Sequence, residues 1–501
     1  MEQLAVQDAQ LDDILRRLAR ADDAMAVLDE QPVSTELPGG GEIIEKLAPE
    51  IRAAALYRHL REIRATGAGP RVRLERATYL TPLITETVNA LMAQPVTASD
   101  RRLAISMPIA LLKCSYDIKR QAVLQSVCQP RMETSLVTDS ILATFSALFD
   151  LLVCYWVQRL PPPQRFWGEL HALYHLASHV GVGSRKSGPR QAPLLREIRN
   201  AYLKPLLLGS LGPTRFNVGE IKQLVSFVAN HAALARLGTA TGLFSVDPWC
   251  DRPPTYAVRN TAKERSVTLC THDLVQILDN AETNLTPRLR EDLRRYWSSE
   301  QVRSEYHQRT DDRVEIVFGL EAAHQLLTGC VDDDDFLGHL GARDAGQRVI
   351  AQTPIELHCA TCVDRSPSGA KLQMAGAPDT LRPGELVTLL MTGEPRCRLG
   401  IVRWTQLTPK LDSVAGVQWL PDSCRPCGTA VVAGTHAVTP YFRSFLIPTA
   451  PSQGPWELIA PTRILKPGDH LHLITHEGEM NLSVTTVVDM TFHVSRFHTA
   501  A

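Results

Sequence analysis

Hydrophobic residues recur with helical spacing up to about residue 300 of the chain and alternate with polar residues beyond it. Near the N-terminus, Leu11, Ile14 and Leu18 fall on one helical face and charged residues on the other, which predicts an amphipathic helix within residues 1–30. The Pro- and Gly-rich residues 32–41 that follow are typical of a linker.

The helical spacing predicts a series of helices separated by short breaks. These helices cover residues 47–63, 79–92, 115–128, 135–158, 164–180, 191–209 and 218–237. Helices that alternate with short breaks indicate stacked helical hairpins. Residues 267–277 fit a short strand or a helix, and residues 286–296 predict a further helix with Thr286 at its N-cap and Pro287 in its first turn.

Strand-like runs dominate from about residue 310 onward, which places a domain boundary near residue 305. The first group covers residues 314–318, 349–355, 357–363, 370–374, 386–391, 398–406 and 415–420. The second group covers residues 430–432, 442–447, 457–460, 470–475, 482–489 and 492–497. Because six short strands suffice for a small barrel or sandwich, the pattern predicts an α+β multidomain protein. An N-terminal all-α helical domain is followed by a first β-domain and a second small C-terminal β-domain packed on it.

An insertion at residues 320–348 interrupts the first group of strands. It contains a helical stretch at residues 320–327 and four consecutive aspartates, Asp332 to Asp335. Adjacent carboxylates could bind calcium, but the EF-hand spacing is missing, so a solvated loop is favoured. The predicted domains are residues 1–41 (helix and linker), 42–304 (helical), 305–428 (first β-domain with insertion) and 429–501 (C-terminal β-domain).

The composition limits the function classes. The sequence has 501 residues, of which 44% are hydrophobic and 21% charged, as in folded soluble proteins. A formal net charge of −1 argues against a large nucleic-acid-binding surface, so neither DNA nor RNA is expected as a partner. The N-terminus lacks a basic region followed by an apolar core, so no signal peptide is expected. Eleven cysteines at scattered spacings favour reduced thiols in a cytoplasmic protein.

Residues 141–157 are largely apolar, which raises the question of a membrane span. Asp150 lies in the middle of this run. A charge at the centre of a span costs about 2.5–3.5 kcal/mol, and the run is short for a bilayer. A buried core helix is therefore predicted, and no membrane span.

Three histidines and two C-x-x-C pairs are the candidate metal ligands: His171, His175, His179, Cys359, Cys362, Cys424 and Cys427. The histidines are spaced one helical turn apart, but the Glu of a metalloprotease helix is missing between them. Several predicted strands separate the cysteine pairs, unlike the close pairs of a zinc ribbon. The first pair is expected on opposite faces of a strand, and the second in a loop that could bind zinc. No metal site is predicted.

A polar turn between two strand-like runs stands out in the β region. Its sequence is Asp364-Arg365-Ser366-Pro367-Ser368-Gly369, which predicts a strand, a sharp turn and a second strand. Alone, this pattern is that of an ordinary hairpin. Upstream, however, Arg309 and Arg313 form an Arg-x-x-x-Arg pattern that runs straight into the strand predicted at residues 314–318.

Paired arginines before a strand, then Asp-x-Ser-x-x-Gly and a short β meander, resemble the PilZ family of small β-barrels, which bind the bacterial messenger cyclic di-GMP. The resemblance covers about residues 305–425 and includes residues 400–404 and 416–420 in the later strands. It implies that the first β-domain is a PilZ-like antiparallel β-barrel with a cyclic di-GMP site and without any cofactor. The implied site residues are Arg309, Arg313, Asp364, Ser366 and Gly369.

The chemistry of the ligand matches these residue types. Cyclic di-GMP carries two phosphodiesters and two guanines, and a guanidinium can bind phosphate, hydrogen-bond guanine and stack on a base. The resemblance implies that the two arginines lie on a flexible segment that wraps over the outer face of the barrel. Asp364 would accept hydrogen bonds from guanine or fix an arginine, Ser366 would bind phosphate or a base edge, and Gly369 would leave room for the ligand.

Two features depart from the family pattern. The stretch between the arginine pair and the turn is much longer than in a simple PilZ barrel, so the insertion must be looped out. A second pair, Arg343 and Arg348, lies closer to the turn but has one residue too many between its members. The first pair is preferred because it directly precedes a strand. Its alternative role is a solvated helix end that pairs with Asp311 and Asp312.

The sequence shows no nucleophile–base pair, phosphate-binding Gly-rich loop or metal-hydrolase motif, so a receptor and not an enzyme is predicted. Ligand would bind at the junction of the helical and β regions and change how the helical domain contacts a partner protein. The alternative is a degenerate scaffold whose barrel no longer binds nucleotide and whose helical region binds partners. Motility or biofilm regulation is implied by the resemblance alone.

Overall fold

A computed structural model describes residues 2–19, 46–94, 101–180, 192–238, 242–257, 266–279, 283–299, 307–328, 355–375, 381–391, 397–408, 410–434, 436–448, 456–491 and 494–500. The chain divides into two compact units. One, here called the helical unit, comprises Met1–Pro213 and Val218–Gln301. The other, here called the β unit, comprises Val302–Ala501 with Thr214–Asn217.

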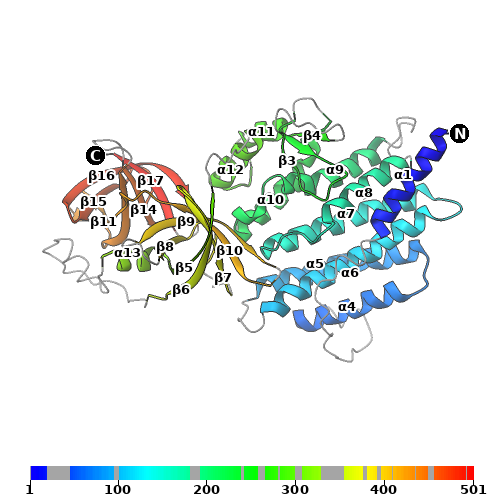
Figure 1. Cartoon of the computed structure of the whole chain (residues 1–501), viewed down its shortest axis with the longest axis horizontal. Helices are drawn as coiled ribbons and strands as arrows, with labels where there is room; N and C mark the ends of the chain where they lie inside the picture. Colours follow the sequence, from blue (N-terminus) through cyan, green and yellow to red (C-terminus); the bar gives the residue numbers. More distant parts are fainter. Residues whose placement is uncertain are drawn as a thin grey trace. The chain divides into compact units, whose positions relative to one another are not determined.

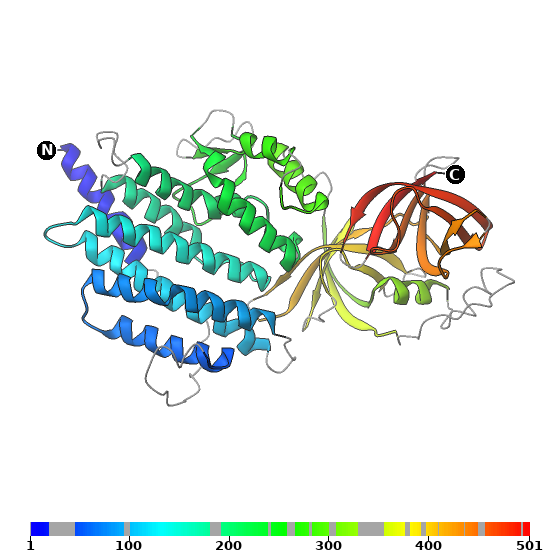
Figure 2. The same ribbon diagram turned by 180° about the vertical axis from the view of Figure 1, so that it is seen from behind.

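Long helices laid side by side form the helical unit (Figures 1 and 2). They are α1 (Glu2–Ala19), α4 (Pro49–Ala65), α5 (Pro70–Ala93), α6 (Arg101–Val127), α7 (Thr134–Val157), α8 (Phe166–His179), α9 (Ala192–Gly209) and α10 (Val218–His231). The predicted helices are confirmed, but α5 and α6 begin well before the predicted residues 79 and 115. Both contain an internal proline, Pro82 and Pro108, which costs backbone hydrogen bonds that burial in the helix stack offsets.

Helix α7 forms the core of the helical unit. Phe145, Leu148, Leu151 and Leu152 on it are completely buried. Among the described helices, α7 alone is long and apolar enough to cross a membrane, and most of its apolar stretch is buried inside the protein. This packing is the one expected of a core helix in a folded protein.

A small antiparallel sheet and two short helices follow α10 and the 3₁₀ turn η2 (Ala232–Leu234). The strands β1 (Arg236–Leu237), β2 (Phe244–Val246), β3 (Thr255–Tyr256) and β4 (Val267–Cys270) pair in the order β1-β4-β2-β3. The prediction of a helix up to residue 237, and of helical structure throughout this region, is wrong here. Strands of two to four residues have too few positions to show an alternating pattern.

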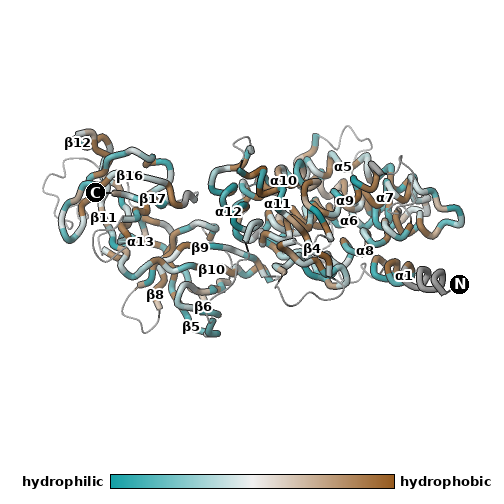
Figure 3. Tube along the Cα trace, turned by 90° about the horizontal axis from the view of Figure 1, so that it is seen from above, coloured by the Kyte–Doolittle hydropathy of each residue, from teal (hydrophilic) through white to brown (hydrophobic). Residues whose placement is uncertain are grey.

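Helix α11 (His272–Leu278) directly follows β4, so residues 267–277 contain both of the elements that the sequence allowed. Helix α12 (Pro287–Ser298) begins as predicted, with the Thr286 hydroxyl accepting a hydrogen bond from the backbone of Leu289 at 3.4 Å. Figure 3 shows that α12 is largely hydrophilic. Leu289, Leu293 and Trp297 are buried at i, i+4 and i+8, which gives the helix a narrow apolar face.

Six antiparallel strands close into a barrel in the first part of the β unit. They are β5 (Gln308–Phe318), β6 (His358–Ser366), β7 (Gly369–Met374), β8 (Leu386–Met391), β9 (Arg398–Leu407) and β10 (Ser413–Trp419). The order around the barrel is β10-β7-β6-β5-β8-β9, with β9 paired to β10. Ile316, Leu372, Leu389 and Val402 fill the interior. Helix α13 (Leu320–Thr328) follows β5, as the sequence predicts, and the strand predicted at residues 349–355 lies mainly outside the described residues.

A second set of strands forms another closed ring. It contains β11 (Arg425–Ala433), β13 (Phe442–Pro448), β14 (Trp456–Pro461), β17 (Val494–Ala500), β16 (Gly478–Met490) and β15 (His470–Thr475), with β15 paired back to β11 and the short β12 (His436–Ala437) beside β11. Leu386 and Ile401 of the first barrel share a core cluster with Phe445 and Ile459 of the second. The α+β multidomain fold class is therefore confirmed, with a C-terminal β-domain packed on the first barrel.

A buried carboxyl group makes the stability of the helical unit depend on pH. Glu169 on α8 accepts a hydrogen bond from the Tyr116 hydroxyl of α6. Burial raises the pKa of Glu169 to about 7, although the Tyr116 hydrogen bond and the nearby Arg120 lower it. The folded state therefore holds a proton that the unfolded chain releases above its ordinary pKa.

Raising the pH from about 4.5 to about 7 is expected to remove up to about 3 kcal/mol of stability through Glu169. The Gln side chain of Glu169→Gln stays neutral and keeps an acceptor for Tyr116. The variant should therefore become more stable relative to the wild type as the pH rises over the same range. Urea denaturation at pH 5, 6, 7 and 8 measures the difference. If the stability of both proteins depended on pH in the same way, the raised pKa of Glu169 would be contradicted.

Candidate functional site

The polar turn is a tight hairpin at one end of the first barrel. Ser366 at the end of β6 pairs with Gly369 at the start of β7, which leaves Pro367 and Ser368 as the turn. The predicted strand, turn and strand are confirmed. The Ser366 hydroxyl lies 3.4 Å from the Gly369 carbonyl, to which it donates, and 3.4 Å from the Ser368 hydroxyl.

The paired arginines lie inside β5 and not on a segment ahead of it. Arg309 is opposite Asp364 on β6, and Arg313 is opposite Thr361. The expectation of a flexible wrapping segment, or of a helix end, is therefore wrong for the described structure. Pairing with β6 extends the strand, and a bulge between Arg309 and Asp312 accommodates one extra residue on β5.

The Thr310 side chain fixes this irregular part of the β5–β6 pair. Its hydroxyl donates a hydrogen bond of 2.6 Å to the Cys362 carbonyl. Arg309 and Arg313 remain exposed on either side of the bulge. The strand pairing thus holds their backbone in place while both guanidinium groups stay accessible to a ligand.

Asp364 belongs to a row of residues that crosses five strands of the barrel. It lies opposite Arg309 on one side and opposite Lys371 on the other. Lys371 in turn lies opposite Gly416, which lies opposite Trp404. Residues directly opposite in antiparallel strands share one face. Because Ala370 and Leu372 on either side of Lys371 point into the core, this row lies on the outer face of the barrel.

Trp404 covers the gap that Gly416 leaves in this row. A Cβ atom added at Gly416 would lie 1.9 Å from the Trp404 Nε1 atom. The indole therefore occupies the space above Gly416, on the strand next to the one that carries Lys371. Neighbouring strands are about 4.8 Å apart, so Arg309 and Lys371 each lie one strand away from Asp364, and the indole lies over the strand next to Lys371.

The carboxylate of Asp364 also contacts His307. The distance from His307 Nδ1 to Asp364 Oδ1 is 3.2 Å, and both side chains are partly exposed. Three cationic side chains, Arg309, Arg313 and Lys371, thus lie on strands around one carboxylate. This arrangement can attract a dianion and still offer an acceptor to its N–H groups.

Gly369 has a structural role in the barrel. A Cβ atom added there would lie 2.3 Å from the Val417 carbonyl oxygen on β10. The missing side chain therefore allows β7 and β10 to pair closely, whether or not a ligand is present. The role expected from the sequence, room for the ligand, stays a prediction.

The sequence did not single out His307, Lys371 or Trp404. Trp404 lay within residues that carry the family resemblance, but no role followed from that. Lys371 is an exposed position of a short alternating strand, and only the strand register aligns it with Asp364. The second arginine pair, Arg343 and Arg348, and the acidic run at residues 332–335 lie outside the described residues.

The candidate metal ligands are engaged in other contacts. His171 Nδ1 lies 2.7 Å from the Tyr202 hydroxyl, and the His175 ring stacks on Trp249. Cys359 is exposed and Cys362 buried, as expected for opposite faces of a strand. The second cysteine pair leads into β11, and the expected loop is wrong for Cys427, whose thiol is buried 3.1 Å from the Ser444 hydroxyl. Within the described residues, no group of three or more ligands could hold a metal ion.

Comparison with known proteins relates the chain to a bacterial signalling receptor. Residues 44–241 match the family model "Cyclic-di-GMP receptor FimW, N-terminal domain". The chain is 22% identical over 394 residues to the Cyclic-di-GMP receptor FimW of Pseudomonas aeruginosa, a match that covers 64% of this chain and 65% of that protein. No solved structure matches the chain. The resemblance to cyclic di-GMP receptors is confirmed, and the PilZ-like features of the barrel are consistent with it.

Gly369→Ala is expected to destabilise the β unit by about 1–3 kcal/mol, because the new methyl group collides with the backbone of β10. Chemical denaturation, followed by the fluorescence of the barrel tryptophans, measures this loss. Gly67→Ala is the matched control, since a Cβ atom there meets open space. Equal stability of the two variants would refute the close approach of β7 and β10.

Proposed function

We propose that the protein is a cyclic di-GMP receptor that binds the messenger on the outer face of its first barrel and is not an enzyme. The observation that carries the proposal is the alignment of Arg309 with Asp364 across β5 and β6, with Lys371 next in the row. The match of the helical region to a cyclic di-GMP receptor domain supports the same ligand.

The contacts follow from the chemistry of the ligand. The guanidinium groups of Arg309 and Arg313 would bind phosphodiester oxygens and a guanine edge, as forked donors do. Asp364 would accept from the N–H groups of guanine after giving up its contact with His307. The Trp404 indole would offer a surface for a base to stack on.

The ligand signal would pass to the helical unit through β5. This strand carries both arginines and is the first strand of the β unit after α12 in the chain. A ligand that binds Arg309 and Arg313 therefore acts on the part of the chain that leads from one unit to the other. The proposed outcome is a change in how the helical unit contacts a protein partner, in a cytoplasmic pathway such as motility or biofilm control. The described cysteines are free thiols, in keeping with a reducing compartment.

A second function rests on the acidic residues beside the arginines. Asp311 and Asp312 lie within the same strand as Arg309 and Arg313, and Asp364 already contacts His307. These carboxylates would oppose an anionic ligand, as in a scaffold that has lost its nucleotide and binds partners through the helical unit. Calorimetry with cyclic di-GMP separates the two functions, because the scaffold would release no heat at high micromolar ligand.

Arg309→Ala and Arg313→Ala are each expected to weaken cyclic di-GMP binding about tenfold or more, since each removes a charge-assisted contact of about 1.5–3 kcal/mol. Isothermal titration calorimetry measures the loss. Arg463→Ala, an exposed arginine of the second barrel, is the control and should bind as the wild type does. If both site variants matched this control, the site would lie elsewhere.

Trp404→Ala is expected to weaken cyclic di-GMP binding, because it removes a stacking contribution of about 1–3 kcal/mol per base. Trp404→Phe keeps an aromatic ring and should keep most of this stacking energy. Tryptophan fluorescence quenching by cyclic di-GMP in the wild type gives an independent readout. Weakening by Phe as large as that by Ala would show that the indole supports the strand and does not stack on the ligand.

A further inference from the structure

The N-terminal helix α1 occupies a groove of the helical unit, where it packs against α8 and α6 (Figure 1). Of the α1 side chains that the structure describes, residues 11–19, Ile14 and Leu18 are buried one helical turn apart. Residues 20–48 join α1 to α4. A connection of this length can span about 100 Å when extended, so contacts, and not chain connectivity, keep α1 in the groove.

One part of the groove binds the last turn of the helix. The guanidinium group of Arg120 on α6 is completely buried and donates a hydrogen bond to the Leu18 carbonyl. The last carbonyls of a helix have no partner within it and carry partial negative charge. Asp117 lies 3.5 Å from Arg120, whose guanidinium is 5.8 Å from the centre of the Tyr116 ring. This buried cation therefore favours the C-terminal end of a helix.

A second part of the groove takes an arginine side chain. The Arg17 Nη2 atom donates to the Pro248 carbonyl at 3.3 Å and to the Gly168 carbonyl at 3.5 Å. Its guanidinium lies 5.4 Å from the centre of the Trp249 ring, within the range of a cation–π interaction, and the His175 ring stacks on the same indole. Two carbonyls and an aromatic face together make a site for a planar cation.

The elements around this arginine site hold one another in place without α1. The Asp251 carboxylate accepts hydrogen bonds from the backbone N–H groups of Arg165 and, at 2.9 Å, of Gly168, at the start of α8. The Asp247 carboxylate accepts from the backbone N–H of Trp249 at 3.1 Å. The loop at residues 247–251 is thus fixed to α8, and the groove is formed independently of its occupant.

Helix α1 fits the arginine site imperfectly. The Arg17 Nη1 and His175 Nε2 atoms are both buried, and neither forms a hydrogen bond with any residue that the structure describes. A buried polar atom without a partner destabilises the state that contains it. In addition, α6 and α8 lie within residues 44–241, which match the receptor domain, whereas α1 lies outside them. These observations favour a groove whose present occupant can be replaced.

We propose that this groove is the docking site for an amphipathic helix of a protein partner, and that α1 competes with that helix. The partner helix presents an arginine near its C-terminal end, with apolar residues three positions before it and one position after it, as in residues 14–18. Its arginine binds the two carbonyls and the indole, and one of its last carbonyls accepts from Arg120. The proposal adds a surface to the partner binding proposed above and holds whether or not the barrel binds cyclic di-GMP.

A fluorescein-labelled peptide of residues 2–19 tests the groove on the full chain by fluorescence anisotropy, without nucleotide. The tethered α1 of the wild type competes with the peptide, so binding should be weak. Arg17→Ala in the chain loosens the tethered helix. It should tighten peptide binding about tenfold or more, because the apparent affinity rises with the fraction of open grooves.

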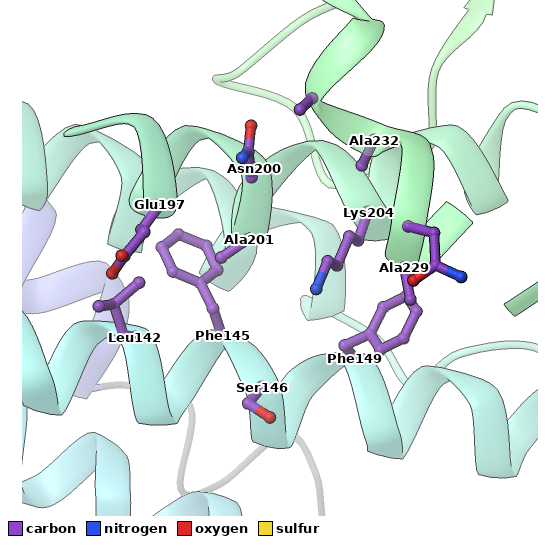
Figure 4. Close-up of a pocket in the computed structure, with 12 residues that line it drawn as sticks. Leu142, Phe145, Ser146, Phe149, Glu197, Asn200, Ala201, Lys204, Ala229 and Ala232 are labelled. Atoms are coloured by element: carbon purple, nitrogen blue, oxygen red, sulfur yellow. The ribbon is translucent and has the colours of Figure 1, made fainter. Parts of the chain in front are cut away.

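Two variants are matched controls for this effect. Arg16 is exposed, and its Nε atom donates to the Asp12 carbonyl within α1, so Arg16→Ala should bind the peptide as the wild type does. Lys204→Met changes a different groove, whose lining residues on α7, α9 and α10 are shown in Figure 4, and should also match the wild type.

The peptide itself carries the reciprocal test. A peptide with Arg17→Ala should bind the Arg17→Ala chain about tenfold more weakly than the unchanged peptide does, and a peptide with Arg16→Ala should not. Equal binding of the unchanged peptide by the wild-type and Arg17→Ala chains, or equal binding of all three peptides, would overturn the proposal. Light scattering identifies another occupant: a wild-type dimer that Arg17→Ala dissociates would show that the groove takes α1 of a second copy, against the proposal.

Discussion

The pairing of β5 with β6 is the constraint on which the candidate nucleotide site depends. This antiparallel register sets Arg309 opposite Asp364, and a bulge in each strand keeps the side chains beyond it on the correct face. A shift of one residue would turn each side chain of β5 to the other face of the barrel. The hydrophobic residues Val314 and Ile316 hold the register because they must point into the barrel core.

Closure of the barrel extends this constraint to the remaining strands. The pairing of β7 with β10 adds Lys371 and Gly416 to the row, and the pairing of β10 with β9 adds Trp404. Two glycines permit these close approaches, Gly369 against the β10 backbone and Gly416 beneath the indole. The outer face is thus determined by the same packing that stabilises the barrel, so ligand-binding residues and barrel stability are coupled.

The helical unit places charged groups in its interior in a different way. Glu169 on α8 accepts a hydrogen bond from Tyr116 on α6, and Lys119 on α6 lies near Asp150 on α7. Buried charges cost stability unless they are paired, and each of these buried groups has such a neighbour. The buried Glu169 carboxyl accounts for the pH dependence expected of the unit.

The sequence by itself determined the order of helices and strands, the hairpin at Asp364 and the residue types suited to a guanine nucleotide. Local spacing carries this information, because period and turn chemistry involve residues close together in the chain. Only the tertiary structure decided that Arg309 and Arg313 lie within a strand, that Lys371 and Trp404 join Asp364, and that a small sheet follows α10. Those outcomes depend on strand register and on contacts between residues distant in the chain. The spacing of residues within one segment does not specify which strand or helix will pack beside that segment.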